Sequence, residues 1–224
     1  MNELVNLLEK NPIFSLIAER DLGLMARQAA ARRYEKGETV ILYGEVWPYL
    51  FLVGEGSVNA VKESGEGRSL IVTTFSAGDI FWGLAFFQDD APMPVTLAAR
   101  EASRLYLWSR EIAEPILARN GRGSWELCRL MAGRMQRASA ILEEMAFQPV
   151  AGRLARLLLD HFELAGDAAI SRHLTLDEMA ARIGSTREMV CRALYSFSDK
   201  SLIEVTRTEF VLTNRDGLAR LVNF

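Results

Sequence analysis

Three charged residues near the C-terminal end of the chain, Arg187, Glu188 and Arg192, are spaced to fall on one face of a helix. The opposite face of that helix is apolar and comprises Val190, Ala193, Leu194 and Phe197. Arginine can donate two hydrogen bonds to O6 and N7 of guanine, and glutamate can accept one from N4 of cytosine. The pattern predicts a helix that reads the DNA major groove, and an amphipathic helical hairpin with a solvated charged face is the plainer alternative.

The residues around this helix have the signals of a helix-turn-helix. Thr175 and Glu178 form a capping box for a first short helix, and Gly184 suits the turn because glycine adopts a positive φ without steric cost. Ser185 and Glu188 repeat the capping box and predict the start of the second helix. The residues expected at the DNA surface are Ser185, Thr186, Arg187, Glu188, Cys191, Arg192 and Tyr195, together with Arg207 at the tip of a predicted β-hairpin, or wing, that follows.

The charge balance does not by itself point to nucleic acid. The 224-residue chain has a net charge of −3, and residues 149–224 contain ten Lys and Arg against ten Asp and Glu. Any DNA contact must therefore come from the placement of particular side chains. No apolar run reaches the roughly 18 residues of a membrane span, and the N-terminus has no signal-peptide pattern, so a cytoplasmic location is expected.

Alternating apolar segments separated by glycines predict a β-rich domain in the first half of the chain. Four of the expected strands are Tyr49–Val53, Val58–Val61, Leu70–Phe75 and Arg104–Trp108. Helical spacing precedes them at Glu3–Lys10 and Ser15–Arg32. The predicted fold class is α+β, with three parts: an N-terminal β-barrel or β-roll with helices in residues 1–110, a dimerisation helix and hinge in residues 111–148, and a winged helix-turn-helix in residues 149–224.

A long helix is expected over Ser124–Met145. Residues at heptad-like intervals form a seam of Leu127, Met131, Arg134, Ala138, Ile141 and Met145. Neighbouring apolar residues widen this stripe enough to cover the β-roll and also to pair with a second copy. The alternative is a helix packed wholly within one chain. Phe147–Pro149 form the expected hinge, because Pro149 suits the first turn of a new helix.

These features occur together, and in this order, in one group of proteins. The chain resembles bacterial transcription regulators of the cyclic-AMP receptor protein and fumarate–nitrate regulator (Crp/Fnr) family over nearly its whole length. The resemblance is carried by YEKGETVILYGE followed by YLFLVGEGSVNAV, by GDIFWGLAFF, by MAFQPVAGRLARLLL and by LTLDEMAARIGSTREMVCRAL.

The resemblance implies that residues 1–110 are a β-roll sensor domain. It also implies a homodimer that binds a palindromic operator, with one recognition helix in each half-site, and that works with RNA polymerase. Arg187, Glu188 and Arg192 match the triplet with which cyclic-AMP receptor proteins read their half-site, which implies a TGTGA-like operator. Activation and repression of transcription are not distinguished by these residues.

One ligand site that the resemblance implies is altered in this chain. In members that bind cyclic AMP, an Arg-Ser pair holds the cyclic phosphate, whereas the corresponding stretch here, Ala91–Thr96, has no cation. Asp79, Asp89 and Asp90 add negative charge nearby, and a buried phosphate without a counter-ion is strongly unfavourable. Of the long-helix Thr-Ser pair that meets the adenine, only Ser139 remains. These departures argue against cyclic AMP as the effector.

Other cofactors of the family are limited by composition. A four-thiolate iron–sulfur cluster needs four cysteines, and the chain has only Cys128 and Cys191. His161 and His173 both lie beyond the hinge, so neither can ligate haem within the sensor domain, although haem held by unusual ligands stays open. His161 is expected to be a core histidine and Cys128 a small buried residue, with redox control by either thiol as the alternative.

With these cofactors disfavoured, the sequence still offers an apolar surface in the sensor domain as a ligand site. The expected effector pocket comprises Phe81, Trp82, Leu84, Phe86, Phe87 and Met93 of the β-rich domain and Met131, Met135 and Ser139 of the long helix. Such a wall suits a small, weakly polar effector of unknown identity that biases the hinge. A constitutive or thiol-controlled regulator and a stand-alone ligand-binding signalling module are the alternatives.

Enzymatic activity is not expected. A metal-dependent cupin enzyme is also a β-roll, but it carries several histidines on the roll, and residues 1–110 contain none. No nucleophile–base pair points to a hydrolase, and no metal site is predicted.

Overall fold

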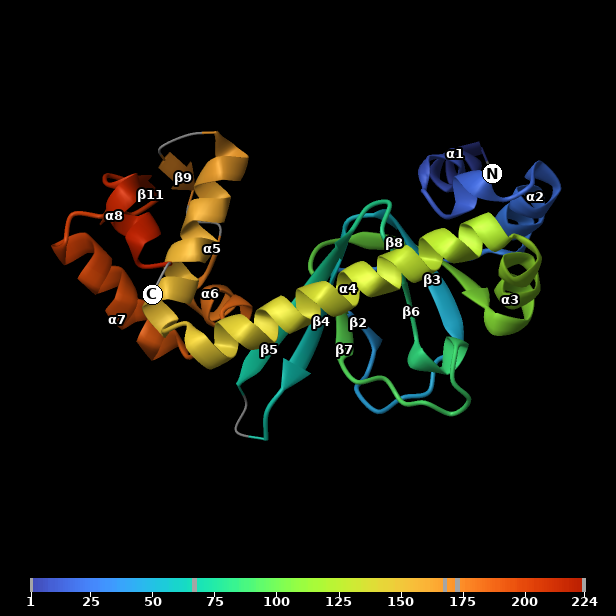
Figure 1. Ribbon diagram of the computed structural model, residues 1–224, viewed down its shortest axis with the longest axis horizontal. Coiled ribbons are helices and arrows are strands. Elements are labelled where there is room, and N and C mark those ends of the chain that lie inside the picture. The colour runs from blue at the N-terminus through green and yellow to red at the C-terminus, as the bar shows by residue number, and fades with distance from the viewer. Residues whose placement is uncertain (1, 66–67, 167–168, 172–173, 223–224) are drawn as a thin grey trace. The chain divides into compact units, whose positions relative to one another are not determined.

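The chain folds into two compact units, and Figure 1 labels most of their helices and strands. The computed structural model describes residues 2–65, 68–166, 169–171 and 174–222. The first unit contains Met1–Lys62 and Val72–Gln136, and the second contains Glu63–Ile71 and Arg137–Phe224.

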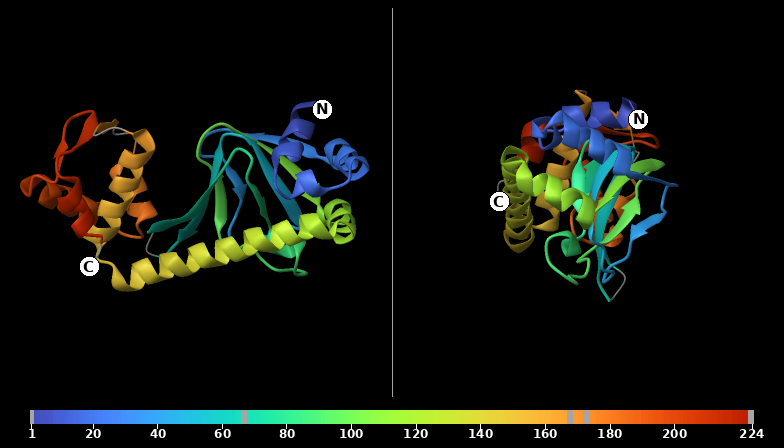
Figure 2. Two further views of the ribbon diagram at one scale, coloured as in Figure 1. Left: turned by 45° about the horizontal axis from the view of Figure 1, so that its top comes forward. Right: turned by 90° about the vertical axis from the view of Figure 1, so that its right-hand side faces the viewer.

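The first unit is built on a β-roll of two four-stranded sheets, which can be followed in Figure 2. One sheet has the order β1-β8-β3-β6, formed by Ala30–Tyr34, Ser103–Ser109, Tyr49–Glu55 and Ile80–Trp82. The other has the order β2-β7-β4-β5, formed by Thr39–Ile41, Thr96–Ala99, Ser57–Glu63 and Ser69–Ser76. The last residue of β4 and the first three of β5 belong to the second unit. The four strands expected from the sequence lie within β3, β4, β5 and β8, so the β-roll prediction is confirmed.

Strand β3 is buried on both faces, which explains its continuous apolar sequence. Successive side chains of a strand point to opposite faces. Phe51 and Val53 accordingly pack in the core between the two sheets, whereas Leu50 and Leu52 pack in a second core against the helices.

Helices cover the outer face of the β1-β8-β3-β6 sheet. They are α1 (Asn2–Lys10), the 3₁₀ turn η1 (Phe14–Leu16), α2 (Glu19–Gln28), α3 (Arg110–Arg119) and the first part of α4 (Gly121–Phe147). The indole N–H of Trp108 in β8 donates to the carbonyl oxygen of Met25 at 2.7 Å, which fixes α2 on the sheet. Figure 1 shows α1, α2 and α3 gathered at the N-terminal end of α4.

The prediction of one helix over Ser15–Arg32 is wrong. The segment forms η1 and α2 and then enters β1 at Ala30. Alanine favours a helix, but Ala30 and Arg32 pair with β8, and this tertiary pairing overrides the local preference. Helix α4 is also longer than expected, at 27 residues.

The second unit contains a winged helix-turn-helix. Its elements are α5 (Val150–Ala165), β9 (Ala169–Ser171), α6 (Leu176–Arg182), α7 (Arg187–Asp199), β10 (Ile203–Val205), β11 (Glu209–Leu212) and α8 (Arg215–Arg220). The small sheet has the order β10-β11-β9, so the predicted hairpin is confirmed, whereas β9 was not expected. Throughout the part of the chain that is described, no helix has the length and apolar character that crossing a bilayer requires.

Candidate DNA-binding surface and sensor core

The turn between α6 and α7 is set by local chemistry. Thr175 caps α6, its hydroxyl oxygen accepting from the backbone N–H of Glu178 at 3.1 Å, as predicted. Gly184 has φ +61°, where a side chain would be strained. The predicted cap of α7 is wrong by one residue, because Thr186 and not Ser185 caps it, accepting from the N–H of Met189 at 3.3 Å.

Helix α7 separates into a buried and an exposed face. The apolar residues expected to be buried, Val190, Ala193, Leu194 and Phe197, are all in the core of the second unit. Arg187, Glu188, Arg192 and Tyr195 are exposed, and Cys191 is half-buried at the boundary. The structure thus brings the predicted base-reading side chains onto one solvent-facing surface.

The two arginines of this surface are paired with carboxylates. Arg187 Nη1 lies 3.0 Å from Asp177 Oδ2, and Arg192 pairs with Glu188 one turn away. All four side chains are largely exposed, so solvent screens these pairs and they break at a cost of about 0–1 kcal/mol. The arginines are therefore held in place yet available to a ligand. Because each arginine has a carboxylate partner, these two pairs add no net charge to the surface.

The wing carries one further cation. The hydroxyl oxygen of Thr206 accepts from the backbone N–H groups of Thr208 and Glu209, at 3.3 and 2.9 Å, which orders the turn between β10 and β11. Arg207 lies exposed at the tip of this turn. An exposed arginine on an ordered turn is suited to a phosphate contact.

The connection between α4 and α5 is braced on the helix-turn-helix. Helix α4 ends at Phe147 and Pro149 caps α5, so the helices break at the predicted hinge. Arg153 of α5 donates from Nε to the carbonyl oxygen of Ile183 at 2.8 Å and from Nη1 to that of Gln148 at 2.9 Å. One guanidinium thus joins the hinge to the residue that precedes Gly184 in the turn.

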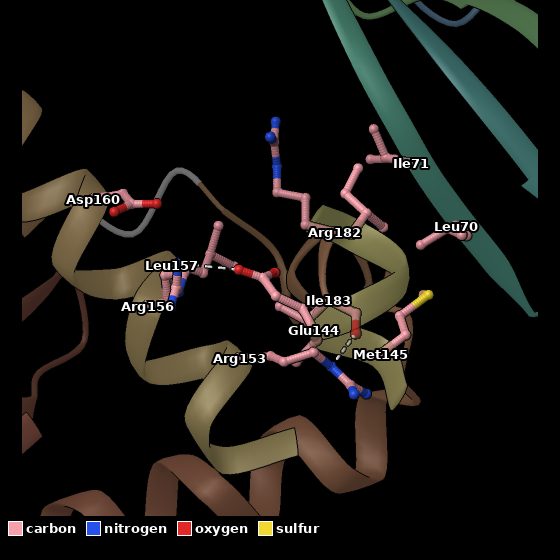
Figure 3. Close-up of a pocket in the computed structure, with 11 residues that line it drawn as sticks. Leu70, Ile71, Glu144, Met145, Arg153, Arg156, Leu157, Asp160, Arg182 and Ile183 are labelled. Carbon is pink, nitrogen blue, oxygen red and sulfur yellow. Dashed lines mark hydrogen bonds and ion pairs between the residues drawn. The ribbon is translucent and has the colours of Figure 1, made fainter. Parts of the chain in front are cut away.

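A cavity of about 170 Å³ adjoins this connection within the second unit. Figure 3 shows its lining from α4, α5, α6 and the start of β5, with Arg156 paired to Glu144 at 3.1 Å. Burial raises the pKa of Asp160, which also lines it. The cavity is small and mixed in polarity, and the sequence patterns gave no sign of it because its residues come from four separate segments.

The structure describes one of the two histidines, His161. His161 is half-buried in α5, and its Nδ1 lies 2.8 Å from the carbonyl oxygen of Leu157. This contact gives one ring nitrogen a partner, but the side chain is only half-buried, so the prediction of a core histidine is met in part. His173 lies outside the described residues.

Aromatic side chains fill the space between the sheets of the β-roll. The ring of Phe81 stacks on Phe51, with centroids 4.5 Å apart, and on Phe75, at 4.7 Å. Met93 lies in the same core and is only 4% exposed. The chain's own side chains therefore occupy the interior of the sensor domain.

The nine residues expected to line an effector pocket do not share one wall. Phe81 and Met93 lie between the sheets, whereas Phe86 and Trp82 pack against the helix-side core. The remaining five, Leu84, Phe87, Met131, Met135 and Ser139, are exposed. Alternation along β6 separates Phe81 from Trp82, which is why an apolar run in sequence does not become one surface.

The residues of the predicted α4 seam also lie in different environments. Leu127 is buried in its own domain and Arg134 reaches across to Phe75 and Trp82. Ile141 and Met145 line the cavity of Figure 3, and Met131 and Ala138 are exposed. Leu127 and Arg134 are thus engaged within their own chain.

A different apolar stripe of α4 faces solvent. It contains Trp125, Met135 and Leu142, which are 68, 71 and 68% exposed. Cys128 lies on the same stripe as an exposed free thiol, so the prediction that it is buried is wrong.

Both the β-roll and the winged helix-turn-helix are similar to known protein families. Residues 31–120 match the family described as cyclic nucleotide-binding domain, and residues 152–221 match the Crp-like helix-turn-helix domain. The CRP-like cAMP-activated global transcriptional regulator of Mycobacterium tuberculosis is 25% identical over 219 residues, covering 96% of this chain and 97% of the relative. The cAMP-activated global transcriptional regulator Vfr of Pseudomonas aeruginosa is 28% identical over 185 residues, covering 78 and 85%.

The fold is shared with solved structures as well. A Crp/Fnr-family transcriptional regulator from Eubacterium rectale superimposes with a TM-score of 0.77 at 20% identity, covering 95% of this chain and 98% of that one. The two domain matches occur in the order that the β-roll and the winged helix-turn-helix occupy here. The chain belongs to the Crp/Fnr family of DNA-binding transcription regulators.

Proposed function

We propose that the protein is a homodimer that recognises a palindromic, TGTGA-like operator with one α7 helix in each half-site. The observation that carries the proposal is the exposed triplet Arg187, Glu188 and Arg192 on the outer face of α7. In this role the two arginines donate to guanines and Glu188 accepts from a cytosine.

Other groups of the domain are suited to position the protein on the DNA backbone. The backbone N–H groups at the start of α7, beside Ser185 and Thr186, carry the partial positive charge of a helix N-terminus. Arg207 on the wing adds a second phosphate contact at a distance from the first. Contacts of this kind fix orientation and carry no sequence information.

We place the dimer interface on the exposed stripe of α4. Six residues follow one another at intervals of 3-4-3-4-3, and all six are exposed in the single chain: Trp125, Cys128, Ala132, Met135, Ser139 and Leu142. This spacing forms a coiled-coil seam, and the small side chains of Ala132 and Ser139 allow two helices to approach closely. The stripe takes the place of the seam expected from the sequence, two of whose residues are engaged elsewhere.

We further propose that the effector is not cyclic AMP, although the two curated relatives described above are named as cAMP-activated. The stretch Ala91–Thr96 has no cation to hold a cyclic phosphate, and Met93 within it is buried. Asp89 beside it is paired with Arg110. Titration calorimetry with cyclic AMP tests this point: no heat of binding is expected, and a micromolar Kd would refute it.

Operator binding is tested with a labelled duplex that carries two inverted TGTGA half-sites. A dimer of this class places half-sites about 10–10.5 base pairs apart, centre to centre. Fluorescence anisotropy should show binding at least about 10³-fold tighter than to a scrambled duplex. Sedimentation of the complex should give two chains per duplex. Equal affinity for both duplexes would contradict the proposed sequence, and one chain per duplex would contradict the dimer.

A further inference from the structure

Contacts of the Arg134 guanidinium tie α4 to the β-roll. Its Cζ lies 4.9 Å from the ring centroid of Phe75 and 4.5 Å from that of Trp82. The same group donates from Nη2 to the backbone carbonyl oxygen of Ile80. Two aromatic rings and a carbonyl from β5 and β6 thus surround one cation of the long helix.

These contacts suit a guanidinium better than any other side chain. A guanidinium is planar and weakly hydrated, so it stacks on aromatic faces and still donates in its own plane. Phe75 is buried and Arg134 is half-buried, so little water competes for the rings. A lysine ammonium is compact and strongly hydrated and cannot make both kinds of contact equally well.

The contact continues into the sensor core. Phe75 stacks on Phe81 at 4.7 Å, and Phe81 stacks on Phe51 at 4.5 Å. Arg134 therefore stands at the outer end of a column of rings that fills the interior of the β-roll. A change at Arg134 acts on the packing of that interior as well as on the position of α4.

We propose that Phe75, Trp82 and the Ile80 carbonyl form a guanidinium-binding site that the chain fills with its own Arg134, and that this internal clamp holds α4 against the β-roll in the DNA-binding form. The second half of the proposal rests on the proposed operator binding. The clamp requires no bound nucleotide. The ligands that can compete with Arg134 for the site are planar organic cations.

The test is chemical rescue in the full-length protein. Hydrogen exchange is measured by mass spectrometry for β6 and for residues 128–136 in the wild type, Arg134→Ala, Arg134→Lys and, as a matched control, Arg137→Ala, which removes an exposed arginine one turn away. Arg134→Ala should exchange about tenfold faster in both segments, because a cation–π pair and a charged hydrogen bond are lost. The exchange rate of Arg134→Lys should lie between those of the wild type and Arg134→Ala, and that of Arg137→Ala should equal the wild-type rate.

Guanidinium chloride at millimolar concentration, far below the denaturing range, should slow exchange again in Arg134→Ala only. Sodium chloride and urea at equal concentrations should not. Operator affinity of Arg134→Ala should fall and recover in parallel. Unchanged exchange in Arg134→Ala, or no rescue by guanidinium, would overturn the guanidinium site.

If Arg134→Ala exchanges faster but binds the operator as tightly as the wild type, the clamp has no effect on DNA binding and the contact is purely structural. If the wild type fails to bind the operator at all, the proposed function fails, while the exchange measurements still decide the guanidinium site. The two failures are therefore distinguishable.

Discussion

Arg187 is held by a carboxylate in the free protein, and this has a consequence for DNA affinity. Its partner Asp177 is exposed in the first turn of α6, close to where phosphates lie in a groove-bound complex. In the proposed complex Arg187 turns to a base, and Asp177 is left as a negative charge beside the DNA. The pair therefore restrains the arginine and at the same time opposes binding.

Asp177→Asn should strengthen binding to both operator and scrambled duplexes. The gain is expected to be below about 1 kcal/mol, because an exposed pair contributes no more than that. Anisotropy titrations at two salt concentrations measure it, and the gain should shrink at the higher one. Asp199→Asn, at the far end of α7, is the control and should change affinity less. A loss of affinity in Asp177→Asn would show that Asp177 positions Arg187 productively.

A second residue-scale prediction concerns acid stability of the sensor domain. Asp21 is buried and accepts from Arg119 Nη2 at 2.6 Å, from Arg119 Nε at 2.9 Å and from Asn120 Nδ2 at 3.1 Å. Hydrogen bonds from Arg119, and then from Asn120, lower the pKa of Asp21 from 3.8 to about 2. A depressed pKa stabilises the fold above pH 3.8, and the contribution is lost as the pH falls toward 2.

Asp21→Asn should therefore have a lower Tm than the wild type at pH 7. Its Tm should also decrease less than that of the wild type between pH 4 and pH 2. Circular dichroism melts across this range measure both effects. The exposed Glu9→Gln is the control and should retain the wild-type profile. An unchanged acid profile in Asp21→Asn would rule out Asp21 as the group responsible.

Single residues were predictable where their role depends on one helix. The exposed triplet of α7 and its four buried partners follow from helical spacing alone, and all lie on the expected faces. Cys128 could not be placed, because its exposure depends on which side of α4 meets the β-roll. That side is set by Leu127 and Arg134, whose partners are distant in sequence.

At the scale of elements, the start of α7 depends on one hydroxyl. Thr186 accepts from Met189 N–H, whereas the N–H of Ser185 donates to the carbonyl oxygen of Ala180 and closes the turn. Both residues have a hydroxyl, and Glu188 stands three residues after Ser185, so sequence alone favours Ser185 as the cap. Only the backbone path out of Gly184 decides between them.

Thr186→Ala should lower the free energy of unfolding by about 1 kcal/mol, the usual contribution of a helix cap. Ser185→Ala should cost less than half as much. Urea unfolding followed by circular dichroism gives both values. The reverse order would mean that α7 begins one residue earlier than the structure shows.

Elements with an apolar pattern or turn signal of their own were predicted, and two short strands without either were missed. The wing hairpin is closed by Thr206 and Glu209, three residues apart. Strand β1 pairs with β8 some seventy residues away, and β9 is a three-residue strand that depends on β11. Neither has an apolar alternation of its own, so nothing in the local sequence identifies it.

At the scale of the whole molecule, the proposed function makes dimerisation and DNA reading depend on each other. A palindromic operator presents two half-sites, and one α7 helix contacts only one of them. The exposed stripe of Trp125, Met135 and Leu142 is the surface through which a second copy would pair.

Met135→Glu combined with Leu142→Glu should give a monomer, because burying two charges in an apolar seam is strongly unfavourable. Sedimentation velocity measures the association state, and operator affinity should fall with it. Gln136→Glu, on an exposed position outside the stripe, is the control and should stay dimeric. A doubly substituted chain that still sediments as a dimer would move the interface away from this stripe.

The most direct test of base reading by α7 is an anisotropy titration of the wild type and Arg187→Ala against the inverted TGTGA operator, its single guanine substitutions and a scrambled duplex. Arg187→Ala should lose about 1–3 kcal/mol on the operator and become indifferent to the identity of one guanine, while the wild type discriminates at every one. Affinity for the scrambled duplex should change little. Equal weakening on operator and scrambled DNA would contradict the account, because Arg187 would then contact only phosphate.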